Sequence, residues 1–235
     1  MKPLYEPRGK AKEYGDLAIN VYTGCPHRCY YCFAPNVLRK DREQFHSIVE
    51  PRPGIIEATK KQLETEKIKG KLIHLCFTCD PYPTGYDSTT TREIIRAIKD
   101  SGNHVQILTK GDGSRDFDLL GENDWYGITI SGAEREREPG AFAEHNRISI
   151  LLDAPCNKWI SFEPVVHDGF VLALLRNIDP NLHMRLKIGK LNYHPSDINW
   201  AEFGRVAESI CKERGLDYYI KDGLRKEMEA PHETM

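Results

Sequence analysis

The sequence predicts an α/β fold built from parallel strands, and two observations carry that prediction. Short apolar runs recur along the whole chain of 235 residues, and segments with helical spacing lie between them. Strands that alternate with helices form a parallel sheet. Six or seven such units are too few for a closed eight-stranded barrel, so we expect a partial, open (β/α)6-type TIM barrel with parallel strands. We expect one domain over residues 1–235.

The predicted strands share apolar, partly β-branched sequences that turn signals bound. In chain order they are 17–22, 72–78, 105–110, a run within 124–131, 158–164, 185–190 and 217–220.

The helical segments lie between these strands. Pro53 starts the first, which ends near Gly70. The sequence 90–93, Thr-Thr-Arg-Glu, matches a capping box that opens the second. Further helices are expected near 142–152, around 171–175 and around 203–210, and a polar, charged stretch runs over 38–52.

The stretch 24–32, Gly-Cys-Pro-His-Arg-Cys-Tyr-Tyr-Cys, follows the first predicted strand and has the spacing C-x₃-C-x₂-C. Three thiolates on one short loop can hold three irons of a cubane cluster and leave the fourth iron without a protein ligand, whereas an electron-transfer cluster usually takes four cysteines. Three cysteines with His27 also match a structural zinc site. Zinc sites, however, usually combine two C-x₂-C pairs.

Residues 24–32, with an aromatic residue before the last cysteine, resemble the radical SAM superfamily. The flanking stretches 5–10, 20–24 and 32–35 resemble its spore photoproduct lyase-like branch, often labelled DNA repair photolyases. The resemblance implies a [4Fe-4S] cluster on Cys25, Cys29 and Cys32 that cleaves S-adenosylmethionine reductively. It also implies a flavodoxin- or ferredoxin-type reductant.

The same resemblance implies roles for residues at the strand ends. Tyr31 would pack near the adenine, and the backbone of Phe33 would contact its amino group. Lys110, at the end of the third strand, would pair with the cofactor carboxylate. Ser131, at the end of the fourth, would bind carboxylate or ribose. Glu163 would bind ribose hydroxyls or substrate.

The end of the second strand carries Cys79 and Asp80, where the superfamily usually contacts the methionine amino group. The usual Gly-Gly-Glu is absent there. Photoproduct lyases use a cysteine near this point as a hydrogen-atom donor, and Thr78 stands at the donor's own position. Cys79 is therefore a candidate donor or a packing residue. Cys76, three residues earlier, is expected to face the opposite way.

Charge and cysteine content limit the partners. The chain carries 33 basic and 35 acidic residues, which argues against a surface that binds nucleic acid everywhere. Residues 1–72 have 14 Lys or Arg against 9 Asp or Glu, a net charge of +5, whereas residues 112–145 have 3 against 9, a net charge of −6. Seven cysteines, with no signal peptide or membrane-spanning run, indicate a reducing cytoplasm.

Three functions remain open at this point. The first is a radical SAM enzyme that acts on nucleic acid or a nucleotide. The second is a radical SAM enzyme for a small metabolite or peptide. The third is a metal-stabilised nucleic-acid-binding module without catalysis. The oligomeric state is not determined by the sequence.

Overall fold

A computed structural model describes residues 2–230 of the chain. Seven parallel strands follow one another in the sheet in chain order, and the sheet is not closed, which confirms the predicted open α/β architecture. The strands are β1 (Leu17–Ile19), β2 (Leu72–Leu75), β3 (His104–Thr109), β4 (Trp125–Thr129), β5 (Asn157–Phe162), β6 (Arg185–Ile188) and β7 (Asp217–Ile220).

The chain forms two compact units. The first comprises residues 1–128 and 135–157, and the second comprises 129–134 and 158–235. The assignment of residues 1–235 to one domain stays a prediction.

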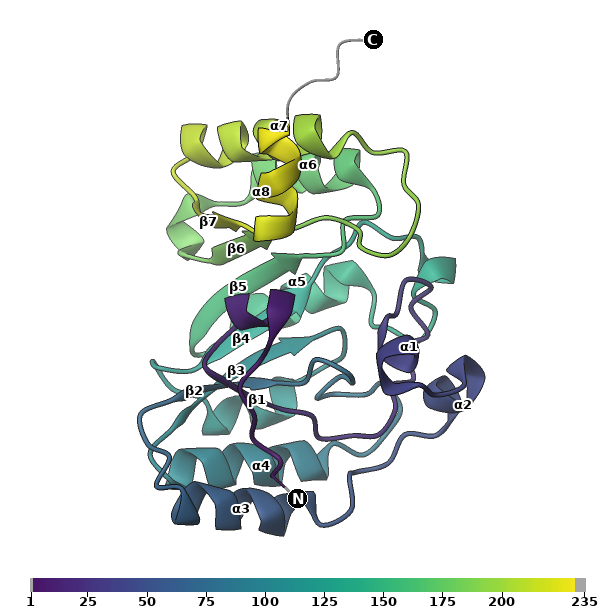
Figure 1. Ribbon diagram of the computed structural model, residues 1–235. Coiled ribbons are helices and arrows are strands. Elements are labelled where there is room, and N and C mark those ends of the chain that lie inside the picture. Colours follow the sequence, from purple (N-terminus) through teal and green to yellow (C-terminus); the bar gives the residue numbers. More distant parts are fainter. Residues whose placement is uncertain (1, 231–235) are drawn as a thin grey trace. The chain divides into compact units, whose positions relative to one another are not determined.

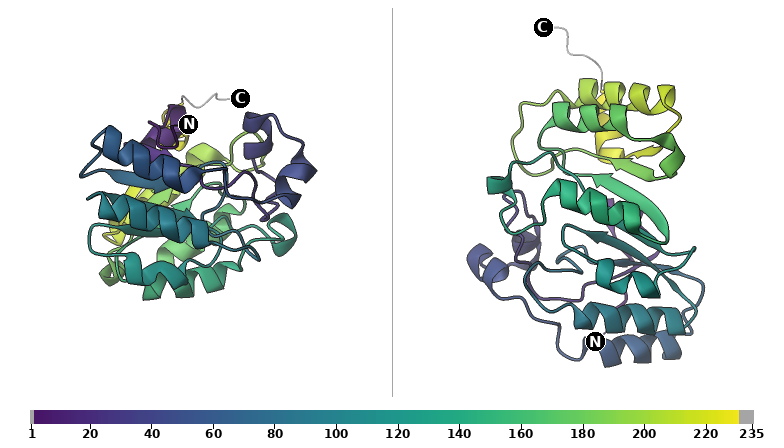
Figure 2. Two further views of the ribbon diagram at one scale, coloured as in Figure 1. Left: turned by 90° about the horizontal axis from the view of Figure 1, so that it is seen from below. Right: turned by 180° about the vertical axis from the view of Figure 1, so that it is seen from behind.

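The first unit contains a parallel sheet backed by helices. Ile19 lies opposite Leu75, and Leu75 lies opposite Ile107, all three fully buried. Its helices are α1 (Ala34–Leu38), α2 (Arg42–Ser47), α3 (Ile55–Thr65), α4 (Thr89–Asp100) and α5 (Glu144–Asp153). Helices α3 and α4 pack side by side, and α1 and α2 lie apart from them (Figures 1 and 2).

Helix α4 shows why the apolar spacing predicts its position. Ile94 and Ile98 lie one turn apart and are fully buried. The predicted capping box is wrong, because α4 begins at Thr89 after Ser88, whose side chain makes no cap bond, and Glu93 pairs with Arg96 instead.

The polar stretch around 38–52 also contains ordered structure. It holds α2 and follows α1, and the Asp41 carboxylate caps α2 by accepting a hydrogen bond from the Gln44 amide at 2.8 Å. With five and six residues, α1 and α2 are too short for apolar periodicity to predict them.

The second unit pairs β5, β6 and β7 in parallel. Its helices are α6 (Asp168–Asn177), α7 (Trp200–Glu213) and α8 (Asp222–Glu229), and α7 packs against both others (Figure 1).

Short 3-10 helices occur in both units. They are η1 (Gly9–Glu13), η2 (Ser114–Leu119), η3 (Arg135–Arg137) and η4 (Pro180–Leu182). Within residues 2–230, no helix has the length and apolar character needed to cross a membrane.

Candidate functional site

The cysteine loop follows β1 and is bounded on one side by α2 and the segment after it. The Cys25 amide donates to the Phe45 carbonyl at 3.2 Å, and the Thr23 amide donates to the Glu50 carbonyl at 2.9 Å. A Cβ at Gly24 would overlap the carbonyl oxygens of Phe45 and Ile48. Only glycine permits this close approach, which explains its place directly before the first cysteine.

A second segment, residues 137–140, encloses the other side of the loop. The Tyr30 amide donates to the Arg137 carbonyl at 2.9 Å, and the Gly140 amide donates to the His27 carbonyl at 3.1 Å. A Cβ at Gly140 would overlap the Pro26 carbonyl oxygen. The loop backbone is therefore held by hydrogen bonds from both sides.

Arg42, on α2, makes a third set of hydrogen bonds to the loop backbone. Its guanidinium donates to the carbonyls of Cys29 at 2.6 Å, Tyr30 at 2.9 Å and Cys32 at 3.1 Å. A planar group with several donors in a fixed arrangement suits such multiple contacts. Arg42 was not predicted from the sequence, because nothing in the spacing of α2 indicates that its side chain reaches the loop.

All three loop cysteines are free thiols. Burial raises the pKa of the Cys25 thiol well above its ordinary value, and it raises that of Cys29 to about 11. The pKa of Cys32 is raised by the same cause. Such thiols are protonated at neutral pH unless a cation lies against them, and metal ions deprotonate the thiols that bind them.

Within residues 2–230, no three His, Cys, Asp or Glu side chains are arranged to hold one metal ion. Cysteines that bind different irons of one cluster do not need to converge on a single point. The donor set, three thiols on a fixed loop, fits that kind of group.

Tyr31 belongs to a buried ionic network. Its hydroxyl donates to Glu138 Oε1, and the second oxygen of Glu138 accepts a 2.7 Å hydrogen bond from Arg147. Glu138 is 4% exposed and Arg147 is 2% exposed. Glu138 lies in the charged segment 134–138, and Arg147 lies on α5. Neither residue was predicted, because in sequence both resemble solvated charged residues.

Lys110 lies next to this network. Its Nζ is 4.0 Å from Glu138 Oε1 and 5.1 Å from the Tyr31 ring centroid. Burial lowers the pKa of Lys110, but the electrostatic influence of the neighbouring Cys29 and Glu138 side chains outweighs burial, so the pKa is raised. The structure thus brings together the cysteine loop, Tyr31 and Lys110.

Asp80 joins the ends of two strands. Its carboxylate accepts hydrogen bonds from the Tyr82 amide at 2.8 Å, the Thr109 hydroxyl at 2.5 Å and the Lys110 amide at 2.8 Å. It is 7% exposed, and its charge raises the pKa of Cys25. Asp80 therefore lies close to the cysteine loop, with its carboxylate held by the chain itself.

The contacts of His27 do not favour a role as a zinc ligand. It is 1% exposed, its Nε2 accepts from the Thr84 amide at 3.3 Å, and its Nδ1 lies 3.5 Å from Asp80. Burial lowers its pKa, which favours the neutral ring. Both ring nitrogens contact protein groups.

The expectation that Cys76 faces away from Cys79 is wrong. Strand β2 ends at Leu75, and Cys76 has a left-handed backbone with a φ of 72°. The turn brings its side chain near the Cys79 thiol, which raises the pKa of Cys76 in addition to the effect of burial. Strand alternation does not apply outside the strand.

Thr78 lies in the same turn. Its hydroxyl oxygen is buried and has no hydrogen-bond partner among residues 2–230. Buried hydroxyls are rarely left unpaired, so this oxygen is available to a ligand at the end of β2.

Phe33 and Ser131 differ in exposure. Phe33 is 43% exposed and lies directly before α1. Ser131 belongs to the second unit and is fully buried. Its hydroxyl accepts from the Ala133 amide at 3.2 Å, and its carbonyl accepts from the Val166 amide at 2.7 Å.

Glu163 follows β5 in the second unit. Its carboxylate pairs with Lys221, which is 3% exposed, and accepts a 3.2 Å hydrogen bond from Asn192. A Cβ at Gly189 would come within 2.8 Å of Glu163 Oε1. The carboxylate is therefore oriented by neighbours from the ends of β6 and β7.

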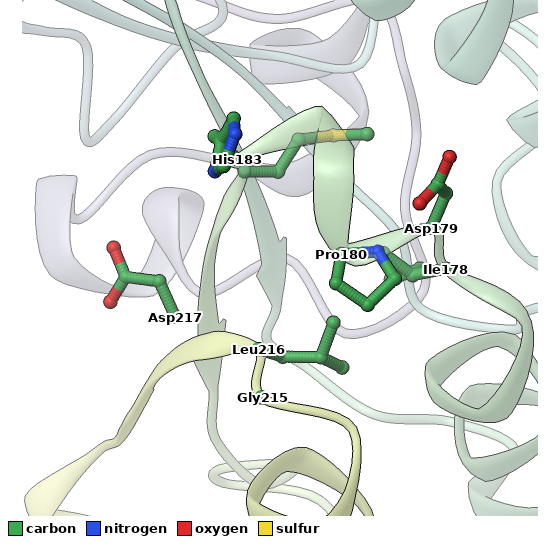
Figure 3. Close-up of a pocket in the computed structure, with 8 residues that line it drawn as sticks. Ile178, Asp179, Pro180, His183, Gly215, Leu216 and Asp217 are labelled. Atoms are coloured by element: carbon green, nitrogen blue, oxygen red, sulfur yellow. The ribbon is translucent and has the colours of Figure 1, made fainter.

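Two cavities lie in the described part of the chain, one beside the cysteine loop and one in the second unit. One of about 300 Å³ borders the cysteine loop at Pro26 and includes Thr84, Arg135 and Asn146. The other, of about 180 Å³, lies in the second unit at the amino ends of β6 and β7 (Figure 3). There, Asp179 and Asp217 lie on opposite sides of Pro180 and Leu216. Chemistry in parallel α/β folds gathers at the carboxyl ends, so the second cavity is not part of the candidate site.

A protein-family model matches more than half of the chain. The family model described as the Radical SAM superfamily matches residues 19–166, which include the cysteine loop, Asp80, Lys110 and Glu163.

Solved structures share the fold. A spore photoproduct lyase mutant has a TM-score of 0.66 at 12% identity and covers 92% of this chain and 79% of its own. A mutant lyase with bound AdoMet and dinucleoside spore photoproduct has a TM-score of 0.62 at 14% identity, with coverage of 90% and 65%. SuiB from Streptococcus suis bound to S-adenosylmethionine has a TM-score of 0.61 at 11% identity, with coverage of 86% and 46%.

One curated relative is an uncharacterized protein, ORF301, of Acidianus two-tailed virus. It is 31% identical over 169 residues, which cover 63% of this chain. The match spans 55% of the length of that relative.

Proposed function

Because the chain belongs to the radical SAM superfamily of enzymes, we propose that Cys25, Cys29 and Cys32 hold a [4Fe-4S] cluster and that S-adenosylmethionine binds beside it. The observation that carries this proposal is the loop itself, three free thiols on a backbone that Arg42 and two flanking segments hold in place. A site with three cysteines leaves one iron for the cofactor, whereas a cluster with four would not.

The cluster, held by Cys25, Cys29 and Cys32, would supply the electron for reductive cleavage of S-adenosylmethionine and so start radical chemistry on the substrate. The chain's own contribution is to orient both cofactors and to enclose them. Tyr31 lies beside Lys110 in the buried network, which supports its role as a packing surface for the adenine. Phe33, directly after Cys32, would offer its backbone to the same base.

The methionine end would lie against the turn after β2. The unpaired Thr78 hydroxyl supports this assignment, since it can accept a hydrogen bond from the amino group. Asp80 would act as a positioning residue there, because its carboxylate joins that turn to β3. Lys110 would form an ion pair with the methionine carboxylate. This pair would replace part of the interaction between Lys110 and Glu138.

Ser131 would form a hydrogen bond with the carboxylate or the ribose of the cofactor, and Glu163 would bind ribose hydroxyls or substrate. In Glu163, the Lys221 ammonium and Asn192 fix the carboxylate, and a fixed acceptor is what two ribose hydroxyls require.

Cys79 would donate a hydrogen atom to the substrate radical. Its partial exposure at the end of β2 supports this role. In Cys79→Ala, 5′-deoxyadenosine formation should persist while the product changes, as measured by mass spectrometry. Unchanged product would remove Cys79 from the mechanism.

The proposed substrate is nucleic acid or a nucleotide. Two observations support it: the fold of spore photoproduct lyase, including the structure with dinucleoside photoproduct, and the Arg135 guanidinium in the cavity beside the loop. Guanidinium groups pair well with phosphates. The electron donor would be a flavodoxin- or ferredoxin-type protein.

Anaerobic reconstitution tests the cofactor assignment. We expect about four iron and four sulfide per chain and reductant-dependent formation of 5′-deoxyadenosine. Cys29→Ala should lose both properties, whereas Cys211→Ala, a buried cysteine of α7, should keep them. Zinc in the purified protein without uptake of iron would contradict the assignment.

A further inference from the structure

Cys76 and Cys79 form a second thiol pair, separate from the three loop cysteines. They have the spacing C-x₂-C, and the Cys79 thiol lies near enough to Cys76 to raise its pKa in addition to the effect of burial. The contact depends on the φ of 72° at Cys76, a conformation that residues other than glycine adopt rarely. The chain thus leaves the extended conformation of β2 at Cys76, and this turn places the two sulfurs near each other.

Neighbouring groups hold this turn in place. The Cys76 amide donates to the Ile19 carbonyl at 2.9 Å. The Asn20 side-chain oxygen accepts from the amides of Phe77 at 2.8 Å and Thr78 at 2.9 Å. The residues between the two cysteines are therefore fixed by β1 and the residue that follows it, and the thiols do not need to find each other by a large backbone movement.

The two sulfurs differ in environment. Cys79 is partly exposed, and its sulfur accepts a hydrogen bond from the Tyr22 amide at 3.4 Å. Cys76 is 6% exposed, and burial raises its pKa well above the ordinary value. Cys79 is thus the thiol that meets a reagent from solution, and Cys76 reacts only with a group already attached to Cys79.

We propose that Cys76 and Cys79 are a redox-active dithiol that small-molecule disulfides oxidise to an intramolecular disulfide. Cys79 attacks a disulfide RSSR, forms a mixed disulfide and releases one RSH. Cys76 then attacks the Cys79 sulfur and releases the second RSH. Two electrons and both thiol protons pass to the two RSH molecules, and the Cys76–Cys79 bond forms.

The sequence offers a direct assay. Trypsin cleaves after Lys71 and Arg92, so the peptide 72–92 contains Cys76 and Cys79 and no other cysteine. Peptide 148–158 contains only Cys156, which is also partly exposed, and reports general reaction with the oxidant. The three loop cysteines lie in other peptides.

The experiment treats cluster-loaded protein anaerobically with glutathione disulfide, alkylates the remaining thiols and maps the peptides by mass spectrometry. We expect peptide 72–92 to lose two hydrogen atoms and to escape alkylation, with reversal by dithiothreitol. In Cys76→Ser, glutathione should remain on Cys79. In Cys79→Ser, Cys76 should stay a thiol.

Three results would overturn the proposal. They are a stable glutathione adduct on Cys79 in the wild-type protein, no reaction of peptide 72–92 under conditions that modify Cys156, and a cross-link between either cysteine and the cysteine loop. The assay follows peptide masses and does not require substrate, so it is independent of the proposed enzymatic activity.

Discussion

The guanidinium of Arg42 lies 2.6 Å from the carbonyl oxygen of Cys29. This hydrogen bond connects α2 to the second cysteine of the loop. The same group reaches the carbonyls of Tyr30 and Cys32, so one side chain orders the backbone that carries two of the three thiols.

Replacing Arg42 by alanine should loosen the loop. Hydrogen bonds from charged groups each stabilise a fold by about 1.5–3 kcal/mol when buried and by less near the surface, so we expect a loss of about 1–2 kcal/mol. Iron retained after reconstitution should fall, as measured by iron and sulfide analysis. Arg39→Ala, an exposed neighbour at the end of α1, is the matched control. Equal iron content in both variants would show that Arg42 is not needed to order the loop.

The Tyr31–Glu138–Arg147 network should be sensitive to single truncations. Glu138→Ala leaves the Arg147 charge buried without its carboxylate, and breaking such pairs costs about 3–5 kcal/mol. Tyr31→Phe removes one hydrogen bond and should cost about 1 kcal/mol. Chemical denaturation of the two variants measures both values. A loss in Glu138→Ala no larger than that in Tyr31→Phe would contradict the importance of the buried pair.

Gly24 should tolerate no side chain. In Gly24→Ala the methyl group meets two backbone carbonyls, which cannot move aside as a flexible side chain can, so we expect poor folding of the loop and loss of cluster. Gly15→Ala is the control, because the nearest atom to its Cβ is at 3.5 Å, an ordinary contact. Cluster absorbance after reconstitution compares them, and intact absorbance in Gly24→Ala would refute the steric argument.

Binding of nucleic acid should depend on Arg135. If its guanidinium pairs with phosphate, binding of single-stranded DNA should weaken as salt rises, since each contact releases counterions. Arg135→Gln should reduce that salt dependence by about one contact, whereas Lys60→Gln on α3 should not, as measured by fluorescence anisotropy. Absence of binding at low salt would instead favour a small metabolite or a peptide.

Alkaline pH should remove the contribution of Cys211 to the free energy of unfolding. Burial raises the pKa of this thiol from 9.0 to about 11. A pKa that is higher in the folded state contributes stability below pH 9, and this contribution is lost as the pH rises toward 11. Wild type should therefore exceed Cys211→Ala in unfolding free energy at pH 8 by about 1–2 kcal/mol. The difference should shrink by about that amount at pH 11, and a constant difference would contradict the assignment.

Local features of the sequence determined the fold class and the cysteine loop. Apolar runs and helical spacing identify strands and helices because each element must bury one face, and C-x₃-C-x₂-C specifies its ligands within a single short loop. Both depend on neighbours along the chain, and the family match and the open parallel sheet confirm the family and the fold.

Only the tertiary structure decided which distant side chains serve that loop. Arg42 bonds the loop backbone, Glu138 accepts a hydrogen bond from Tyr31 of the loop, and Arg147 acts through Glu138. The charges of these three residues have no periodicity that distinguishes them from solvated residues. The contact between Cys76 and Cys79 likewise depends on one left-handed φ, which hydrogen bonds to Ile19 and Asn20 support. Such contacts arise from packing between segments far apart in sequence, and for that reason strand alternation predicted the direction of Cys76 wrongly.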